Sequence, residues 1–141
     1  MSLERIFGIA GTALNSQMIR MNATASNLAN AGTVSGSEDD AFRAKRPVFK
    51  ALVDKEMTNS GFQHVGGVKV DRIVDDKTPV SKIYSPGNPL ADKDGFVYSS
   101  NVSEVTEMVE MMAAARSYQN NVEVVNTARE LMMRTLEVAK A

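Results

Sequence analysis

Apolar side chains near the start of the chain recur at alternating steps of four and three. The stripe consists of Leu3, Phe7, Ala10, Leu14, Met21 and Leu28, with polar Gln17 and Thr24 at its two remaining places. This is the period of one helical face that packs along another helix. Asn30 and Gly32 tolerate the left-handed conformation that ends helices, so the pattern predicts a helix over residues 3–30. An ordinary small bundle core would produce the same stripe.

The opposite face of this predicted helix is polar but almost uncharged. Arg20 is the only charged residue between Ile6 and Ser37. The polar positions are Asn15, Ser16, Gln17, Asn22, Ser26, Asn27 and Asn30. A helix face in bulk water normally carries Lys and Glu, whereas amides and hydroxyls can be buried without the desolvation cost of an ion. We therefore predict that other polypeptide covers both faces, one from this chain and one from neighbouring molecules.

The composition changes between residues 37 and 100, where Lys, Asp, Gly, Pro and Val dominate. Short strands are predicted at 42–53, 68–74, 80–84 and 96–98, which lie between turn signals rich in Gly and Pro. Pro47 confines the first of these strands to a sheet edge or a bulge. So few strands can bury only a modest core.

A second long apolar stripe follows Asn101. Asn101 or Ser103 is the predicted N-cap, and Glu104 and Glu107 fall in the first turn, where the helix dipole favours carboxylates. The stripe contains Met108, Met111, Ala115, Tyr118, Val122, Val125, Met132, Leu136 and Ala139. It is widened beyond the seam of two helices by Val105, Met112, Val124, Ala128, Leu131 and Val138, so more than one neighbour is implied.

These patterns predict an α+β fold. Two long terminal α-helices pair as an antiparallel coiled-coil hairpin, and a small β-rich insert lies in the middle of the chain. The predicted helical assembly domain comprises residues 1–32 and 101–141, and the insert with its extended loops comprises residues 33–100.

Composition and charge disfavour several functions. The formal net charge is -1, which gives no general attraction for nucleic acid or an anionic membrane. The chain has no cysteine, so it forms no disulfide and no cysteine zinc site. It has no run of about eighteen apolar residues, so no membrane insertion is predicted. The first residues lack the basic start of a cleaved signal peptide, and none is expected.

Candidate catalytic, metal-binding and cofactor-binding residues do not emerge from the sequence. The single histidine, His64, lies between glycines without a nearby partner for a catalytic relay, and we interpret it as a surface loop residue. The segment from Asp92 to Gly95 is read as a plain turn, because a calcium loop begun there would place Ser103 where glutamate is needed. Glu107 and Glu110 lie one helical turn apart and are expected to be exposed.

Several segments resemble the flagellar axial family of rod, hook and hook-associated proteins. The signature shared by that family is similar to residues 7–14, Asn22 and residues 26–30. Three further segments, 42–49, 84–98 and 101–108, resemble a proximal rod member in particular, and residues 115–124 are similarly close. Ser100 stands where proline is common, and Ser103 where aspartate is common. Serine still caps a helix, so the second helix should begin only slightly less stably.

The resemblance implies a structural subunit of the bacterial flagellar basal-body rod, the periplasmic drive shaft that transmits motor torque. Its partners would be other copies of itself, other rod proteins, the rod-base/export-gate junction protein and the flagellar type III export apparatus. The apolar residues Leu3, Phe7, Leu14, Met21 and Leu28 would then pack within the chain against Met108, Met111, Tyr118, Val122 and Val125. Hydrogen bonds to adjacent subunits would come from Asn15, Gln17, Asn22, Ser26, Asn27 and Asn30.

One alternative from another functional class stays open. Nine methionines could provide an adaptable surface for peptides, so a monomeric helical module that binds a peptide or protein remains the second hypothesis.

Overall fold

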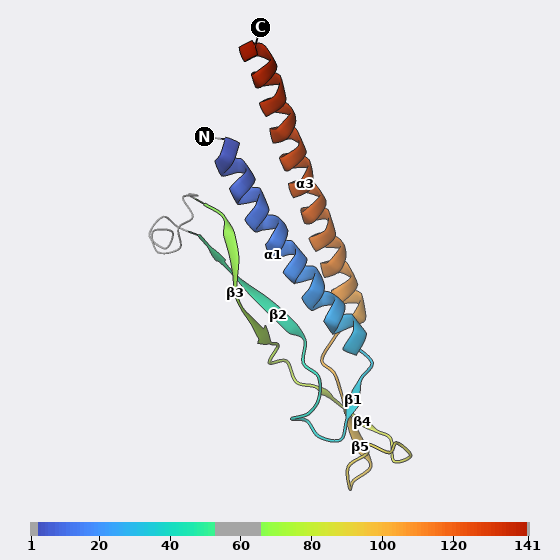
Figure 1. The fold of residues 1–141 in the computed structure, drawn as a ribbon. Coiled ribbons are helices and arrows are strands. Elements are labelled where there is room, and N and C mark those ends of the chain that lie inside the picture. Colours follow the sequence, from blue (N-terminus) through green and yellow to red (C-terminus); the bar gives the residue numbers. More distant parts are fainter. Residues whose placement is uncertain (1–2, 53–65, 141) are drawn as a thin grey trace. The chain divides into compact units, whose positions relative to one another are not determined.

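A computed structural model describes residues 3–52 and 66–140, and it has a long helix at each end of the chain (Figure 1). Helix α1 spans Leu3–Asn30 and helix α3 spans Glu104–Lys140, as the apolar stripes predict. Ser103 is the N-cap of α3, because the amide of Thr106 donates to its Oγ over 3.4 Å. Asn101, the alternative cap, forms its hydrogen bonds elsewhere.

The described residues between the helices form five short strands, whose arrangement is drawn in Figure 1. They are β1 (Val34–Ser35), β2 (Lys45–Ala51), β3 (Val68–Asp75), β4 (Ser81–Tyr84) and β5 (Phe96–Ser99). Four of them match the predicted strands, and Pro47 lies within β2. The sequence did not predict β1. The strands form two sheets, an antiparallel one in the order β1-β5-β4 and a pair of β2 with β3. The fold class is therefore α+β with terminal helices.

The predicted loop position of His64 lies outside the described residues. So does Val53, the last residue of the first predicted strand. Among residues 3–52 and 66–140, no helix has an apolar stretch of the length that crossing a bilayer requires.

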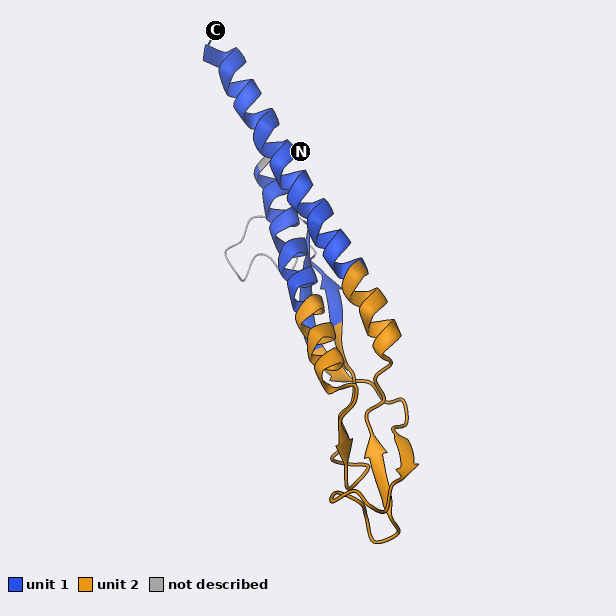
Figure 2. Ribbon diagram, turned by 90° about the vertical axis from the view of Figure 1, so that its right-hand side faces the viewer, with its two compact units in different colours: residues 1–19, 48–72, 113–141 blue, residues 20–47, 73–112 orange. Residues whose placement is uncertain are grey.

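The chain divides into two compact units that each take part of both helices (Figure 2). Unit 1 contains residues 1–19, 48–72 and 113–141, and unit 2 contains residues 20–47 and 73–112. In unit 2 the helices run antiparallel: Arg20 forms an ion pair with Glu110, and Asn27 bonds to Glu107. The sheet β1-β5-β4 belongs to the same unit, and Val97 of β5 is among its buried residues.

In unit 1 the start of β3 is hydrogen-bonded to α1. The amide of Val68 donates to Thr12 Oγ1 over 3.2 Å, and Ser16 Oγ donates to the carbonyl of Val68 over 3.4 Å. Gly67 makes this close approach possible, because it has a φ of +135° and a Cβ there would lie 2.8 Å from Thr12 Oγ1. Leu52 joins the strands by donating its amide to the carbonyl of Gly67 over 3.0 Å.

The buried side of α3 follows a regular heptad. At three places it lies one residue before the predicted seam, at 107, 114 and 121 in place of 108, 115 and 122. Its buried or half-buried positions include Glu107, Met111, Ala114, Tyr118, Asn121, Val125, Ala128 and Met132. The predicted packing of Met108 inside the chain is wrong, since this side chain is 55% exposed. Small residues such as Ala10, Ala23 and Ala114 supply much of the core, which lets backbones approach closely.

Candidate assembly surface

Asn27 lies at the centre of a buried polar cluster in unit 2. Its side-chain amide Nδ2 donates to the carbonyl of Lys45 over 3.1 Å and to Glu107 Oε2 over 2.9 Å. Its Oδ1 accepts the amide of Lys45 over 2.7 Å. Asn27 is fully buried by the chain's own β2 and α3. The prediction that Asn27 bonds to an adjacent subunit is therefore wrong, because its hydrogen-bonding groups are used within the chain.

Glu107 is also fully buried, so its predicted exposure is wrong. Its Oε1 lies 2.7 Å from Arg46 Nη1, and its Oε2 accepts from Asn27. A buried carboxylate needs such partners, because removing an ion from water without compensation costs several kcal/mol. The signal for burial was present in the sequence: Glu107 lies four residues before Met111 on the heptad. Its charge made an exposed position the natural interpretation.

A second asparagine ties the beginning of β2 to the segment after β3. Asn101 Oδ1 accepts the amide of Ala44 over 2.8 Å, and its Nδ2 donates to the carbonyls of Asp76 and Thr78. The pKa of Asp76 is lowered by hydrogen bonds from the hydroxyl and then the amide of Thr78, with a further contribution from Arg46, against a smaller opposing effect of burial. Ala44, Lys45 and Arg46 thus each bind a different part of unit 2.

The polar face of α1 is covered by the chain in one part and exposed in another. Ser16 is buried against β3. Gln17 is half-buried, and its Oε1 has no hydrogen-bond partner among the described residues. Asn15, Asn22 and Ser26 are exposed. Half-buried Asn30 donates to the carbonyl of Ser26 over 2.8 Å, which occupies one of its donors.

The predicted apolar contact residues lie mostly at intermediate burial. This holds for Phe7, Leu14, Met21 and Leu28 on α1, and for Met111, Tyr118, Val122 and Val125 on α3. The side chain of Leu3 is not among those that the structure describes. None of the eight described side chains is fully covered by the chain, so each keeps some surface that a further neighbour can cover.

The most exposed apolar surface of unit 2 is an outward stripe of α3. We call Val105, Met108, Val109 and Met112 the α3 ridge; they are 74%, 55%, 61% and 63% exposed. Their spacing of three, four and seven residues places them on one side of the helix, away from buried Glu107 and Ala114. Two of the four were part of the widened stripe in the sequence. Because Met108 was predicted to pack in the seam with α1, the sequence did not show that the four ridge residues form one continuous surface.

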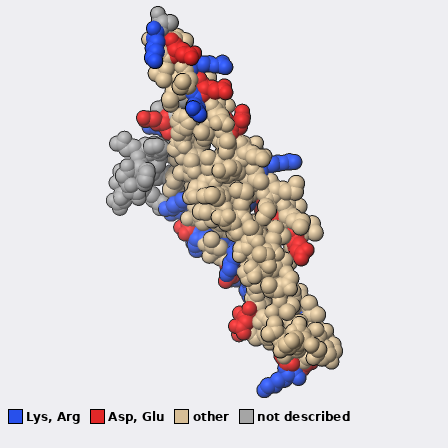
Figure 3. Space-filling model, turned by 45° about the vertical axis from the view of Figure 1, so that its right-hand side comes forward, with Lys and Arg blue, Asp and Glu red and all other residues tan. Residues whose placement is uncertain are grey.

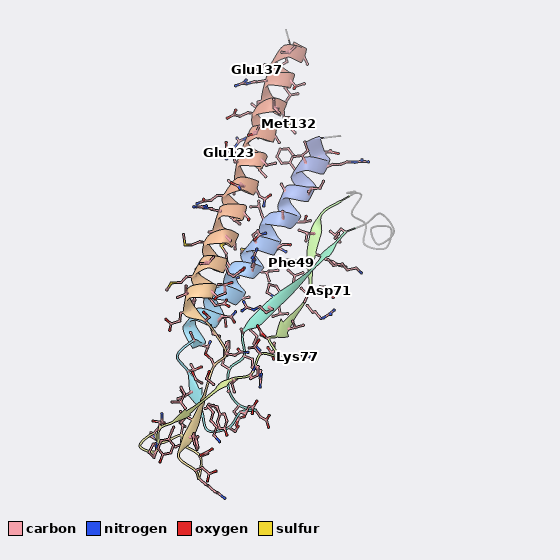
Figure 4. All side chains as sticks on the ribbon, turned by 180° about the vertical axis from the view of Figure 1, so that it is seen from behind. Phe49, Asp71, Lys77, Glu123, Met132 and Glu137 are labelled. Atoms are coloured by element: carbon pink, nitrogen blue, oxygen red, sulfur yellow. The ribbon has the colours of Figure 1, made fainter. Side chains whose placement is uncertain are left out.

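The same side of α3 becomes charged further along the helix. Glu123, Glu130, Arg134 and Glu137 lie there with Met133, around a shallow polar hollow within unit 1. Charged side chains gather at the C-terminal end of α3 in Figure 3, and Figure 4 shows Glu123 and Glu137 along this half of the helix. The apolar ridge is therefore a local feature of the first turns of α3. Among the described residues, no group of acidic or histidine side chains is arranged to hold a metal.

Two protein-family models match this chain, and they identify its class of protein. A family model described as "Flagella basal body rod protein" matches residues 7–35. A second model, described as "Flagellar basal body rod FlgEFG protein C-terminal", matches residues 93–138. Both helix-forming ends thus match proteins of the flagellar basal-body rod, as the resemblance predicts.

Full-length relatives narrow the class to one family. The chain is 46% identical to the flagellar basal-body rod protein FlgC of Yersinia enterocolitica, and 45% identical to that of Salmonella typhimurium, over 99% of this chain and 100% of each relative. FlgC of Buchnera aphidicola from Acyrthosiphon pisum is 42% identical at the same coverage. The chain belongs to the FlgC family of flagellar basal-body rod proteins, and its role is that of a structural rod subunit.

Proposed function

We propose that this rod subunit assembles through its terminal helices, and that the α3 ridge is its main contact with a neighbouring subunit. The observation that carries the proposal is the exposure of four apolar side chains on a helix whose own seam with α1 is already occupied. Contiguous exposed apolar surface of this kind is typical of an interaction site. The neighbours would be further copies of the chain and other rod proteins.

Burial of the ridge supplies a driving force for assembly. A Val or Met side chain that becomes fully buried stabilises a complex by about 1.5–3 kcal/mol, and the ridge side chains are already partly covered. Because a subunit would use the ridge against a different surface of its neighbour, the contact is heterologous, and it builds a helical tube when the rotation from one subunit to the next does not close a ring. Many such contacts along the tube would transmit torque.

Membership of the rod family supports several further proposals. We propose that the subunit lies in the periplasmic rod, is exported by the flagellar type III apparatus and contacts the rod-base/export-gate junction protein. It acts as a structural protein and not as an enzyme. Exposed Asn15, Asn22 and Ser26 are proposed to add neutral hydrogen bonds to adjacent subunits, a role that Asn27 cannot have.

A charge placed in the ridge tests the proposal. Met108→Glu would put a carboxylate into the subunit contact, where its desolvation opposes assembly. The matched control is Gln119→Glu, an exposed position on the same helix outside the ridge. Each variant is expressed in a strain that lacks the native gene, and completed rods are counted in isolated basal bodies. We expect rods to be lost with Met108→Glu and retained with Gln119→Glu.

Circular dichroism of the purified variants separates assembly from folding. Both variants should keep the helical content and unfolding midpoint of the native chain, because both positions are exposed. Normal rod numbers in a strain carrying Met108→Glu would refute the ridge as the contact. A soluble native chain that captures peptides in the apolar hollow between Ile6 and Leu131, lined also by Val124, would instead favour the helical binding module.

A further inference from the structure

The α3 ridge contains two methionines on the same side of the helix. Met108 and Met112 are four residues apart, and both are more than half exposed. Met111 lies between them in sequence but on the buried seam, where it is only half-exposed or less. The chain has no cysteine, so its methionines are the sulfur atoms that an oxidant can reach. Half of the ridge is thus built from an oxidisable side chain.

We propose that Met108 and Met112 are a modification site, at which oxidation by peroxides prevents a subunit from joining its neighbour. The inference rests on the proposed role of the ridge. Hydrogen peroxide transfers one oxygen atom to the thioether Sδ as its O–O bond breaks, so the sulfur loses two electrons and the peroxide is reduced to water. The product, methionine sulfoxide, is neutral, polar and a strong hydrogen-bond acceptor.

Sulfoxide at the ridge opposes assembly for a physical reason. An apolar contact offers no donor to the new S=O oxygen, so burial leaves that oxygen without a hydrogen bond. The same modification on the free subunit has little effect on folding, because both methionine residues are more than half exposed. Assembly in turn covers the sulfur atoms, so a subunit that has already joined the rod is protected from the oxidant.

Met133 provides a control inside the same helix. It is 55% exposed, the same fraction as Met108, but it lies among Glu130, Arg134 and Glu137. A sulfoxide there remains solvated beside charged groups. Peroxide should therefore oxidise Met133 about as readily as Met108, but without consequence for the ridge contact.

The first experiment measures where oxidation occurs. The purified chain and intact basal bodies are treated with dilute hydrogen peroxide, and sulfoxide is located by peptide mass spectrometry. In the free chain, Met108, Met112 and Met133 should oxidise faster than Met111. In basal bodies, Met108 and Met112 should be protected. Equal rates at Met108 and Met111 in the free chain, or undiminished oxidation of the ridge in basal bodies, would overturn the inference.

The second experiment measures the effect on assembly. Glutamine approximates the neutral polar sulfoxide, so the double variant Met108→Gln/Met112→Gln is compared with Met133→Gln in the strain used above. An unpaired buried polar group weakens a contact by roughly ten- to a hundredfold, and we expect rod numbers to fall with the double variant only. Circular dichroism checks that both variants are folded.

The outcomes distinguish this inference from the proposed function. If Met108→Glu blocks rods but the double glutamine variant forms them normally, the ridge remains a contact and the oxidation site is refuted. If both form rods normally, the proposed contact fails and this inference fails with it.

In a further comparison, peroxide should reduce rod formation in cells with the native chain, relative to untreated cells. It should do so less with Met108→Leu/Met112→Leu, which keeps the ridge apolar and removes the sulfur. An equal reduction in both strains would also refute the site.

Discussion

The substitution Asn27→Asp replaces the side-chain NH2 group at the centre of the buried polar cluster with a carboxylate oxygen. The new side chain can still accept the amide of Lys45, but it has no N–H to donate. An oxygen replaces the nitrogen that lies 3.1 Å from the Lys45 carbonyl and 2.9 Å from Glu107 Oε2. Two hydrogen bonds are lost, and two carboxylates come into direct contact at a site closed to solvent.

The expected loss of stability is large for a chain of this size. Each partner left unpaired costs about 1–3 kcal/mol. Two unit charges 2.9 Å apart repel by up to about 6 kcal/mol at an effective dielectric constant near 20, and Arg46 offsets only part of this. We therefore expect the free energy of unfolding to fall by about 4 kcal/mol or more at neutral pH, when small domains have about 5–15 kcal/mol in total.

The pH dependence identifies the cause. In the folded variant the two carboxyl groups can share one proton, which raises the pKa of the pair above the unfolded values near 4. A raised folded-state pKa means that the variant is stabilised at low pH and loses this stability as the pH rises. The deficit relative to the native chain should therefore be largest at neutral pH, should shrink as the pH falls through the raised pKa, and should be smallest below about pH 4.

Urea unfolding followed by circular dichroism at several pH values measures the effect. Asn22→Asp is the matched control, because Asn22 is exposed on the same helix; its free energy of unfolding should change by no more than about 0.5 kcal/mol. The reasoning would be refuted if Asn27→Asp unfolded like this control at neutral pH, or if its deficit were the same at every pH.

Two further predictions concern unit 2 and the helix seam. The pKa of Asp76 is lowered in the folded chain, so its ionised form stabilises the fold above the unfolded pKa near 4, and this contribution disappears as the pH falls through the lowered value. Asp76→Asn should remove that part of the acid dependence of unfolding. Ala114→Leu should cost about 1–3 kcal/mol in unfolding experiments, because Ala114 is fully buried in the seam. Ala113→Leu, at the adjacent exposed position, should cost far less; equal losses would place the seam elsewhere.

The sequence predicted the secondary structure more accurately than the side-chain contacts. Both helices and four strands follow from apolar period and turn residues, which are local properties. The two-residue strand β1 could not be predicted in this way. Its pairing of Val34 with Ser99 depends on residues that lie far apart in the sequence.

The side-chain environments of two residues show what periodicity cannot resolve. Met108 and Glu107 are adjacent, and apolar character alone assigned the methionine to the seam and the glutamate to solvent. The structure has the reverse arrangement, because Asn27 and Arg46 together supply hydrogen bonds and charge to Glu107. These two partners come from α1 and β2, so no local pattern around Glu107 reveals them. The low charge of α1 predicted that neighbouring molecules cover its polar face. At Ser16 and Asn27 the cover comes from the same chain instead, and cover of exposed Asn15, Asn22 and Ser26 by neighbours stays a prediction.

The hydrogen bonds that join the two ends of the insert, between the end of α1 and the segment before α3, also affect how rod subunits can diverge in evolution. Ser100 donates its hydroxyl to the carbonyl of Ala31 over 2.6 Å and its amide to that of Thr33 over 3.2 Å. These bonds close the insert into a loop at the point where the chain leaves α1 and approaches α3. The entropy of closing a flexible loop grows only with the logarithm of its length, and each doubling costs about 0.6 kcal/mol. Evolution can therefore lengthen, shorten or replace the turn between β4 and β5 at little thermodynamic cost to helix pairing, whereas Lys45, Arg46 and Val68 must keep their bonds to the helices. The outer turns of a subunit are thus free to vary while its helices keep the same partners.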